Sequence, residues 1–372
     1  MLTVGITGQS GFIGSHLYNT IGLFTEAYKL IDFQDNFFEN ATLLDAFVSK
    51  CDVIVHLAAM NRHFDSEVIY NTNIKLVNTL IASLKRTNSS VHIIMSSSSQ
   101  EEKDNLYAKS KKDGRKLFID WQRNSNGLFT GLIIPNVFGP FGKPNYNSVV
   151  STFCHKIVKD EKPEIHIDGI VSLIYVGELI QKILSVIDKG KSNQKFVIKS
   201  TYQIKVSEIL NLLNFFKRKY LEKGEIPELN SIFELNLFNT FRSYIDIKNF
   251  FPVKFTQNTD KRGSFVEIIR LGIGGQVSFS TTLPEITRGN HFHIRKIERF
   301  AVIKGKALIQ LRKIGTNEVL DFYLNGDEPA YIDMPIWYTH NIKNIGEDVL
   351  YTNFWINEAY NSDDSDTYFV EV

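Results

Sequence analysis

Short apolar runs and longer helical patterns alternate along the N-terminal two thirds of the chain. The apolar runs predict buried strands, because strands covered on both faces are continuously apolar. These runs are Leu2–Thr7, Tyr28–Ile31, Cys51–Met60 and Val91–Met95, and patterns of helical period start at Ser15 and cover 70–85 and 205–223. Strands that alternate with helices predict an α/β fold with a parallel sheet.

From Val253 onward the pattern changes to short alternating strands separated by turn signals. The turn signals are Gly272-Ile273-Gly274-Gly275, Lys304-Gly305-Lys306, Asn325-Gly326-Asp327 and Asn344-Ile345-Gly346. Regular spacing of this kind predicts an all-β barrel or jelly roll. Because the composition shifts near 244–254, we expect two domains, 1–247 and 248–372.

Composition and charge exclude several classes of protein. The 372 residues are 43% hydrophobic and 22% charged with a net charge of +1, so no nucleic-acid partner is expected. No apolar run reaches membrane-spanning length, which argues against membrane insertion. The two cysteines, Cys51 and Cys154, indicate no disulfide framework and fit a reducing cytoplasm.

A glycine-rich loop follows the first predicted strand and leads into the first helix. Gly8 permits a tight turn, Gly11 lets a pyrophosphate approach the backbone, and Gly14 lets the helix pack on the strand. Asp32 ends the next strand, near the place where an acidic group binds ribose hydroxyls, and no Arg or Lys follows until Lys50. This favours NAD, although a glycine turn without a ligand and a turn-capping Asp are the alternatives.

Tyr107 and Lys111 are four residues apart and therefore share one helix face. A lysine ammonium near a phenol stabilises the phenolate, so we expect a lowered pKa for Tyr107 and a role in proton transfer. The serine run 96–99 follows a predicted parallel strand, at the end where such sheets bind ligands.

The N-terminal part resembles the extended short-chain dehydrogenase/reductase family. The matching stretches are Thr7–Gly14, His56–Ala59, Asn73, the serine run, Tyr107 with Lys111, and Pro135–Pro140. The resemblance implies a Rossmann-like, doubly wound parallel sheet that binds NAD(P)H. It also implies that Ser98 and Tyr107 hold the substrate carbonyl, with Ser97 in that role if the register differs by one.

The same resemblance assigns the remaining binding residues. Lys111 would also bind the nicotinamide ribose, and Asn136, Asn147 and Ser148 would lie against a nucleotide-sugar. The residues expected to bind the cofactor are Gly8, Gly11, Phe12, Ile13, Gly14, Asp32, Leu57, Ala58, Ala59, Asn73, Tyr107 and Lys111.

Two histidines in the C-terminal part, His291 and His293, point the same way on a strand. Glu298 lies at an odd offset from them, so a bend at 294–296 must return it to their face. His340 offers a third imidazole. Three imidazoles and a carboxylate are a natural ligand set for zinc, whereas surface histidines in a β-rich domain are the alternative.

Two stretches, Gly289–Gly305 and Gly326–Asn344, resemble the two motifs of the cupin family. One departure is Trp337, which stands where a glycine usually follows the proline by two. The resemblance implies an all-β cupin, or jelly-roll, domain. His291 would be a candidate base if no metal binds, and Tyr338, Lys296 and Arg288 are further candidates.

A reductase domain followed by a cupin is an uncommon pairing. Together with the stretches 143–149, 152–154, 260–265, 289–291, 338–342 and 366–372, it resembles a family of bifunctional enzymes of capsular and lipopolysaccharide synthesis. This implies epimerisation of UDP-2-acetamido-2,6-dideoxy-4-keto-hexose at carbon 3 in the cupin. Reduction at carbon 4 would then give UDP-2-acetamido-2,6-dideoxy-L-talose, on the route to UDP-N-acetyl-L-fucosamine. The family also implies a homodimer and NADPH, whereas Asp32 favours NADH.

Three alternatives are open. The chain could be a single-activity sugar-nucleotide epimerase or reductase whose cupin only binds or dimerises. It could be a dehydratase, but Ser99-Gln100 stand where dehydratases carry Asp-Glu. It could be a dinucleotide sensor without activity, but the intact Tyr107 and Lys111 argue against this.

Overall fold

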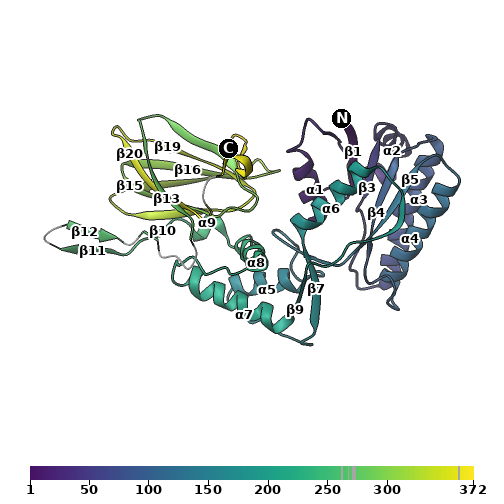
Figure 1. Ribbon diagram of the computed structural model, residues 1–372, viewed down its shortest axis with the longest axis horizontal. Helices are drawn as coiled ribbons and strands as arrows, with labels where there is room; N and C mark the ends of the chain where they lie inside the picture. Colours follow the sequence, from purple (N-terminus) through teal and green to yellow (C-terminus); the bar gives the residue numbers. More distant parts are fainter. Residues whose placement is uncertain (261–262, 267, 270–273, 359–360) are drawn as a thin grey trace. The chain divides into compact units, whose positions relative to one another are not determined.

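The chain forms two compact units in the computed structural model, which describes residues 1–260, 263–266, 268–269, 274–358 and 361–372 (Figure 1). The first unit contains Met1–Thr152 and Glu164–Ile209, and the second contains Phe153–Pro163 and Leu210–Val372. The helices α5 (Val149–Val158) and α7 (Val206–Phe216) each begin in the first unit and end in the second. The expected functional boundary between 247 and 248 stays a prediction.

The first unit is built on a six-stranded sheet in the order β2-β1-β3-β4-β5-β8, and every neighbouring pair is parallel. The predicted parallel sheet is therefore confirmed. Strand order reverses between β1 and β3, and sheets of this kind bind ligands at the carboxyl ends of the strands beside such a reversal. The strands are β1 (Leu2–Thr7), β2 (Tyr28–Ile31), β3 (Val53–His56), β4 (His92–Ser98), β5 (Leu128–Ile134) and β8 (Asn193–Val197).

Helices cover both faces of this sheet with apolar side chains. On one face, Leu17 of α1 and Ile183 of α6 pack with Ile6, and on the other Leu80 of α3 and Phe118 of α4 are buried in a second core. The helices are α1 (Phe12–Ile21), α2 (Ala41–Val48), α3 (Ser66–Arg86), α4 (Leu106–Arg123) and α6 (Val176–Lys189), with a 3-10 turn η1 (Asp35–Glu39). A small sheet adds β6 (Asn136–Phe138), β7 (Ile170–Tyr175) and β9 (Tyr202–Lys205).

The second unit contains two antiparallel five-stranded sheets, ordered β10-β18-β15-β20-β13 and β17-β16-β19-β14-β21, and a hairpin β11-β12. The predicted β-rich C-terminal part is confirmed. Its strands are β10 (Val253–Lys254), β11 (Gln257–Asp260), β12 (Gly263–Val266), β13 (Gln276–Thr282), β14 (Thr287–Phe292), β15 (Glu298–Lys304), β16 (Lys306–Lys313), β17 (Val319–Asn325), β18 (Ala330–Met334), β19 (Tyr338–Asn344), β20 (Leu350–Ile356) and β21 (Tyr368–Phe369), with a 3-10 turn η3 (Ser362–Asp364).

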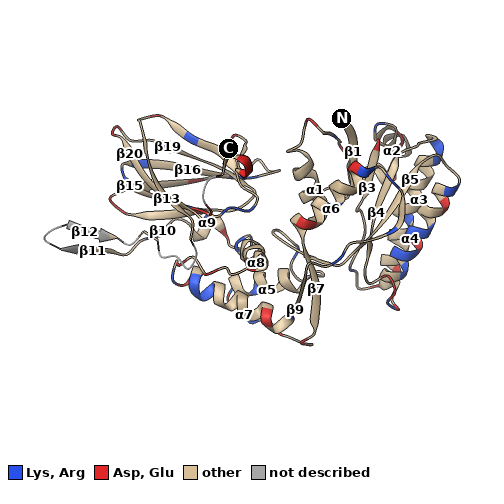
Figure 2. Ribbon diagram, viewed as in Figure 1, with Lys and Arg blue, Asp and Glu red and all other residues tan. Residues whose placement is uncertain are grey.

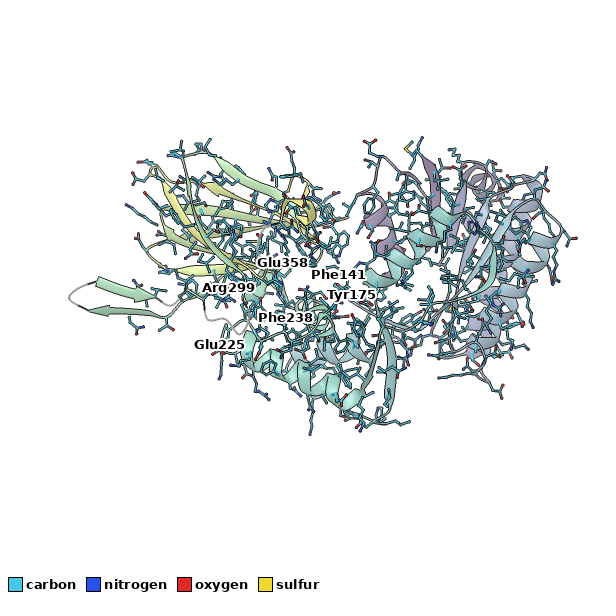
Figure 3. All side chains as sticks on the ribbon, in the orientation of Figure 1. Phe141, Tyr175, Glu225, Phe238, Arg299 and Glu358 are labelled. Atoms are coloured by element: carbon cyan, nitrogen blue, oxygen red, sulfur yellow. The ribbon has the colours of Figure 1, made fainter. Side chains whose placement is uncertain are left out.

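The predicted helix over 205–223 is realised as α7 followed by the π-helical turn η2 (Lys217–Leu221). This turn buries Tyr220, whose hydroxyl donates a 2.6 Å hydrogen bond to Asp333 of β18. Arg299 of β15, labelled in Figure 3, donates to both oxygens of Asp333 at 2.7 and 3.0 Å. Its guanidinium also lies 3.7 Å from the ring centroid of Tyr331. A buried polar network thus fastens η2 to the sheet.

Two more helices, α8 (Ile232–Arg242) and α9 (Ile247–Phe250), complete the second unit. Figure 2 shows that basic residues outnumber acidic ones along α4, although the net charge of the whole chain is only +1. Within the described parts of the chain, no helix has both the length and the apolar character needed to cross a bilayer.

Candidate functional site

The glycine loop after β1 is shaped by close backbone approach. Gly8 has φ +72°, and a Cβ there would lie 2.8 Å from the backbone nitrogen of Ala58. A Cβ at Gly14 would lie only 2.1 Å from the carbonyl oxygen of Gly8. Gly11 begins α1 without a side-chain cap, and no acidic residue occupies the first turn. The helix N-terminus can therefore receive an anionic group such as a pyrophosphate.

The loop after β3 lies against the glycine loop. Leu57, Ala58 and Ala59 are half-buried there, and the amide nitrogen of Ala58 lies 3.4 Å from the hydroxyl of Thr7. Phe12 and Ile13, the first residues of α1, are also half-buried. The small side chains of Ala58 and Ala59 and the uncapped start of α1 are what close approach of a dinucleotide to the backbone requires.

Asn73 of α3 is buried and uses its whole amide within the protein. Its oxygen accepts from the Met60 nitrogen at 2.7 Å, and its nitrogen donates to the Met60 carbonyl and the Ser110 hydroxyl, both at 3.0 Å. Asn73 therefore positions the loop after β3 against α4. A direct contact with the cofactor stays a prediction.

Asp32 directly follows β2 and is exposed. Its described hydrogen-bond partner is Tyr18, whose hydroxyl donates at 3.2 Å. Burial and the Asp32 carboxylate together raise the pKa of Tyr18. The site thus presents a carboxylate and a neutral phenol, which suit ribose hydroxyls better than a phosphate.

Ser98 and Tyr107 face each other at the end of β4. The Ser98 hydroxyl lies near enough to the Tyr107 phenol to lower its pKa and accepts from the Gln100 nitrogen at 3.1 Å, whereas the preceding residue, Ser97, donates to Glu101 at 2.7 Å. Consecutive strand residues point to opposite faces, so only one of the two serines can reach Tyr107. The geometry favours Ser98 over Ser97 for contact with a substrate carbonyl, and that role stays a prediction.

The expected lowering of the Tyr107 pKa is wrong for this structure. Burial raises it to about 12, only partly offset by the hydrogen bond from Ser98. Lys111 lies 5.9 Å from the phenol ring centroid and donates to the Ser96 carbonyl at 3.2 Å, so its charge is directed elsewhere. Burial also lowers the pKa of Lys111 to about 8. Tyr107 is therefore a protonated donor at neutral pH.

The three expected substrate residues lie on two segments. Asn136 of β6 is exposed and donates to the Ser172 carbonyl at 3.3 Å. Asn147 donates to the Asn61 carbonyl at 3.2 Å, and the Ser148 hydroxyl accepts from a backbone nitrogen in the first turn of α5 at 3.2 Å.

Sequence reasoning missed how the 145–148 segment is held. Arg62 donates to the carbonyls of Asn145 and Tyr146 at 2.5 and 3.2 Å, and the Asn61 nitrogen donates to the Tyr146 hydroxyl at 3.1 Å. These contacts join residues more than 80 positions apart, so no local sequence pattern predicts them.

A buried ion pair beside Ser97 was also missed. Arg115 donates to both oxygens of Glu101 at 2.8 and 3.3 Å, and both side chains are largely buried. Gly131 makes room for the arginine, because a Cβ there would lie 2.6 Å from its Cδ. The spacing of Tyr107, Lys111 and Arg115 at intervals of four was the available signal, since it places all three on one face of α4.

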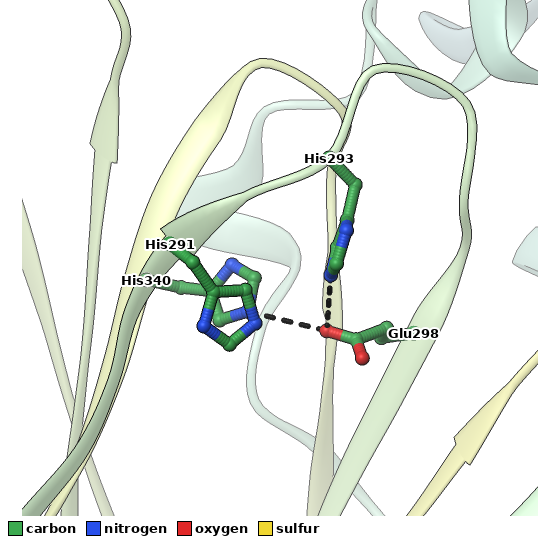
Figure 4. A group of neighbouring side chains, drawn as sticks. All are labelled: His291, His293, Glu298 and His340. Atoms are coloured by element: carbon green, nitrogen blue, oxygen red, sulfur yellow. Dashed lines mark ion pairs between the residues drawn. The ribbon is translucent and has the colours of Figure 1, made fainter. Parts of the chain in front are cut away.

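The four predicted metal ligands converge between the two sheets of the second unit (Figure 4). His291 of β14 and His340 of β19 come from one sheet, and Glu298 of β15 comes from the other. His293 lies in the loop between β14 and β15. The predicted break before Glu298 is therefore confirmed, whereas the expectation that both histidines lie on one strand is wrong. One ligand atom from each residue lies within 4.8 Å of the others.

This geometry fits a metal ion. The Nε2 atoms of His293 and His340 lie 3.1 and 3.2 Å from Glu298 Oε2, yet these buried atoms have no hydrogen-bond partner. Nδ1 of His293 hydrogen-bonds the Asp366 carbonyl, and Nδ1 of His340 hydrogen-bonds the Tyr338 carbonyl. The Nε2 atom of each ring is therefore free to coordinate a metal. Bonds of about 2.0–2.2 Å in a tetrahedral zinc site place ligand atoms roughly 3.3–3.6 Å apart.

Trp337 occupies the motif position where a glycine is usual, and its φ is +63°. Glycine adopts this left-handed conformation without strain, which explains the usual residue. Here the indole is buried and stacks on Phe292, the neighbour of two ligands, with ring centroids 5.5 Å apart. Trp337 therefore packs against the end of β14 although its backbone has a conformation that is unfavourable for a residue with a side chain.

The three other candidates for proton transfer in the second unit have different surroundings. Arg288 donates to the Thr282 hydroxyl at 3.1 Å, and Lys296 is buried with its ammonium on the Ser365 carbonyl at 2.7 Å. Burial raises the pKa of Tyr338 to about 12, and burial lowers that of His291 to about 4. An uncharged His291 keeps a lone pair for a metal or a proton.

Comparison with known proteins matches both units. Residues 4–198 match the NAD dependent epimerase/dehydratase family, and residues 258–368 match the polysaccharide biosynthesis C-terminal domain. The chain is 30% identical to the UDP-2-acetamido-2,6-beta-L-arabino-hexul-4-ose reductase of Pseudomonas aeruginosa, over 100% of this chain and 99% of that protein.

Solved structures give the same picture. The capsular polysaccharide assembling protein CapF from Staphylococcus aureus is 32% identical with a TM-score of 0.62, and both chains are covered completely. RMD from Pseudomonas aeruginosa is 18% identical with a TM-score of 0.53 over 59% of this chain and 83% of its own, which shows the fold alone. The chain belongs to the NAD dependent epimerase/dehydratase family.

Proposed function

We propose that the chain is a bifunctional UDP-sugar epimerase and reductase. The observation that carries this proposal is the pair of separate sites on one chain, Ser98-Tyr107-Lys111 in the first unit and the histidine–glutamate cluster in the second. A relative that covers the whole chain is named as a reductase of a UDP-hexul-4-ose, which is a 4-keto sugar. The first unit would reduce the ketone at carbon 4 of such a substrate.

The reduction needs a hydride donor, a proton donor and a hold on the ketone oxygen. The nicotinamide cofactor supplies the hydride when bound. Tyr107 is protonated at neutral pH because its pKa is raised to about 12, so it can give its proton to the ketone oxygen as that oxygen gains charge. The Ser98 hydroxyl would hydrogen-bond the same oxygen, and Lys111 would hold the nicotinamide ribose. Asn136, Asn147 and Ser148 would line the nucleotide-sugar.

The second unit would epimerise carbon 3 before the reduction. Two antiparallel sheets with a ligand set between them support a cupin, or jelly-roll, domain. A proton next to a ketone is acidic, so the reaction needs a base on one face and an acid on the other. Arg288, Tyr338 and His291 are candidates, whereas the Lys296 ammonium is already engaged with a backbone carbonyl. The combined product would be UDP-2-acetamido-2,6-dideoxy-L-talose.

Zinc would be held by His291, His293, Glu298 and His340. When bound, it would either polarise a ketone or tie the two sheets together. Four protein ligands fill a tetrahedral zinc, which favours the structural role. A structural zinc also favours a second candidate function. In this alternative the chain is a single-activity reductase whose cupin serves only for binding or dimerisation.

The dehydratase alternative finds less support. Glu101 follows the serine run, but Ser97 and Arg115 occupy both of its oxygens. A carboxylate fixed in this way is unavailable for the acid–base chemistry of elimination. Homodimerisation and a cytoplasmic location complete the proposal, on the family resemblance and the free thiols of Cys51 and Cys154.

The proposal is tested with the UDP-4-keto sugar in deuterated buffer. Tyr107→Phe should slow oxidation of the reduced cofactor by at least roughly 100-fold, because the proton donor is gone. Deuterium uptake at carbon 3, followed by NMR, should continue because it takes place in the other unit. Tyr70→Phe, which removes a phenol bound to Asp113, is the matched control and should leave both signals unchanged. Loss of both signals in Tyr107→Phe would reject the division into two sites.

A further inference from the structure

Asp366 makes four hydrogen bonds to the loop that carries His293. Its carboxylate accepts from three successive backbone nitrogens, those of Ile294, Arg295 and Lys296, at 3.2, 3.0 and 3.0 Å. Its own carbonyl oxygen accepts from Nδ1 of the His293 ring. The residue is 4% exposed, so these bonds are shielded from water. One residue therefore organises both the backbone of the loop and the imidazole.

The place of His293 is not set by strand pairing. β14 ends at Phe292, β15 begins at Glu298, and the two strands belong to different sheets. The backbone nitrogens of the connecting loop therefore lack partners from either sheet. Three successive amides that converge on one carboxylate form an anion-binding concavity, and this gives the loop a defined shape.

The backbone of Asp366 is itself suited to the position. Its φ is +44°, a left-handed conformation that aspartate and asparagine adopt more readily than other residues with a side chain. The segment 361–372 is held at both sides of it. The Lys296 ammonium donates to the Ser365 carbonyl, and β21 pairs with β14 at His291 and Phe292.

We propose that Asp366 is a positioning residue for the metal, and that segment 361–372 is a clamp that aims the His293 Nε2 atom at Glu298 and His340. The carbonyl oxygen of Asp366 can accept a hydrogen bond but cannot donate one. It therefore keeps the proton of the His293 ring on Nδ1 and leaves the Nε2 lone pair for coordination. This inference rests on the metal site of the proposed function. Metal affinity would then depend on Asp366, which lies 73 positions from His293 in the sequence.

The test is the zinc affinity of the full chain, measured by competition with a chromophoric chelator. Asp366→Asn keeps the size and the left-handed backbone preference but puts an amide NH₂ among the backbone N–H groups. We expect zinc affinity to fall about 10- to 100-fold, as when partners of metal ligands are removed elsewhere. Asp327→Asn is the matched control, because Asp327 is an exposed aspartate in the turn between β17 and β18 and lies outside segment 361–372. It should change affinity by less than roughly threefold.

A second variant keeps the proposal testable if Asp366→Asn does not fold. Lys296→Met removes the bond to the Ser365 carbonyl while leaving Asp366 and every ligand in place, and it should weaken zinc binding in the same direction. The visible spectrum of the cobalt-loaded chain should also change with Asp366→Asn but not with Asp327→Asn. Parent-like zinc affinity in both clamp variants would overturn the clamp while leaving the metal site intact. A parent chain that binds no zinc would overturn the metal site and the clamp together.

Discussion

At the scale of single residues, the clearest case is Ser97 and Ser98, which are adjacent and chemically identical but face different partners. One hydroxyl is committed to a buried glutamate and the other meets Tyr107. Tyr107 shows why the sign of a pKa shift cannot be read from spacing. A lysine four residues away predicts a lowered pKa, but burial of the phenol dominates and keeps the proton on.

Asp32 is expected to decide the preference between NADH and NADPH. Its carboxylate would repel the 2′-phosphate of NADPH and accept from the ribose hydroxyls of NADH. We therefore expect a higher kcat/KM with NADH, and Asp32→Ala should shift the ratio toward NADPH by roughly tenfold, about 1.4 kcal/mol. Steady-state kinetics with both cofactors measure this ratio, and Glu39→Ala, a charge removal on the exposed end of η1, is the control. A strong NADPH preference in the unaltered chain would contradict this role for Asp32.

At the scale of elements, the buried Arg299-Asp333 pair joins β15 and β18, and Tyr220 connects it to η2. Arg299→Met should destabilise the chain by about 3–5 kcal/mol, because it leaves a buried carboxylate without its charge partner. The double variant Arg299→Met with Asp333→Leu should recover much of the loss, since neither charge remains. Thermal unfolding measures both.

An exposed ion pair gives the comparison for this network. Lys254 lies 2.7 Å from Glu328 with both side chains at least 70% exposed, so Lys254→Met should barely change the unfolding temperature. If Arg299→Met behaves like Lys254→Met, the buried network does not hold η2 on the sheet. A double variant less stable than Arg299→Met would point to packing of the Asp333 site instead.

At the scale of the whole molecule, sequence patterns predicted what local chemistry dictates. The strand-glycine-helix start, the His-x-His pair and the break before Glu298 each depend on a few neighbouring residues. Asp366, Arg62 and the Arg115 side chain act across long separations in the chain, and their partners are known only after folding. The helix predicted over 205–223 continues into a π-helical turn, in which Tyr220 is buried and bonded to Asp333 of β18. Tertiary contacts thus decide both supporting residues and helix ends.

Removal of metal ligands should affect the second unit and leave the reductase site of the first unit active. His291→Ala with His293→Ala removes two of four ligands, so bound metal, measured by mass spectrometry of the purified chain, should fall from stoichiometric to near zero. Deuterium uptake at carbon 3 should be lost with it. Reduction of a substrate already epimerised should persist, because Ser98, Tyr107 and Lys111 lie in the other unit. His166→Ala, an exposed histidine of the first unit, controls for surface binding of metal. Unchanged metal content would reject the ligand set, whereas loss of reduction as well would mean that the two units depend on each other for activity.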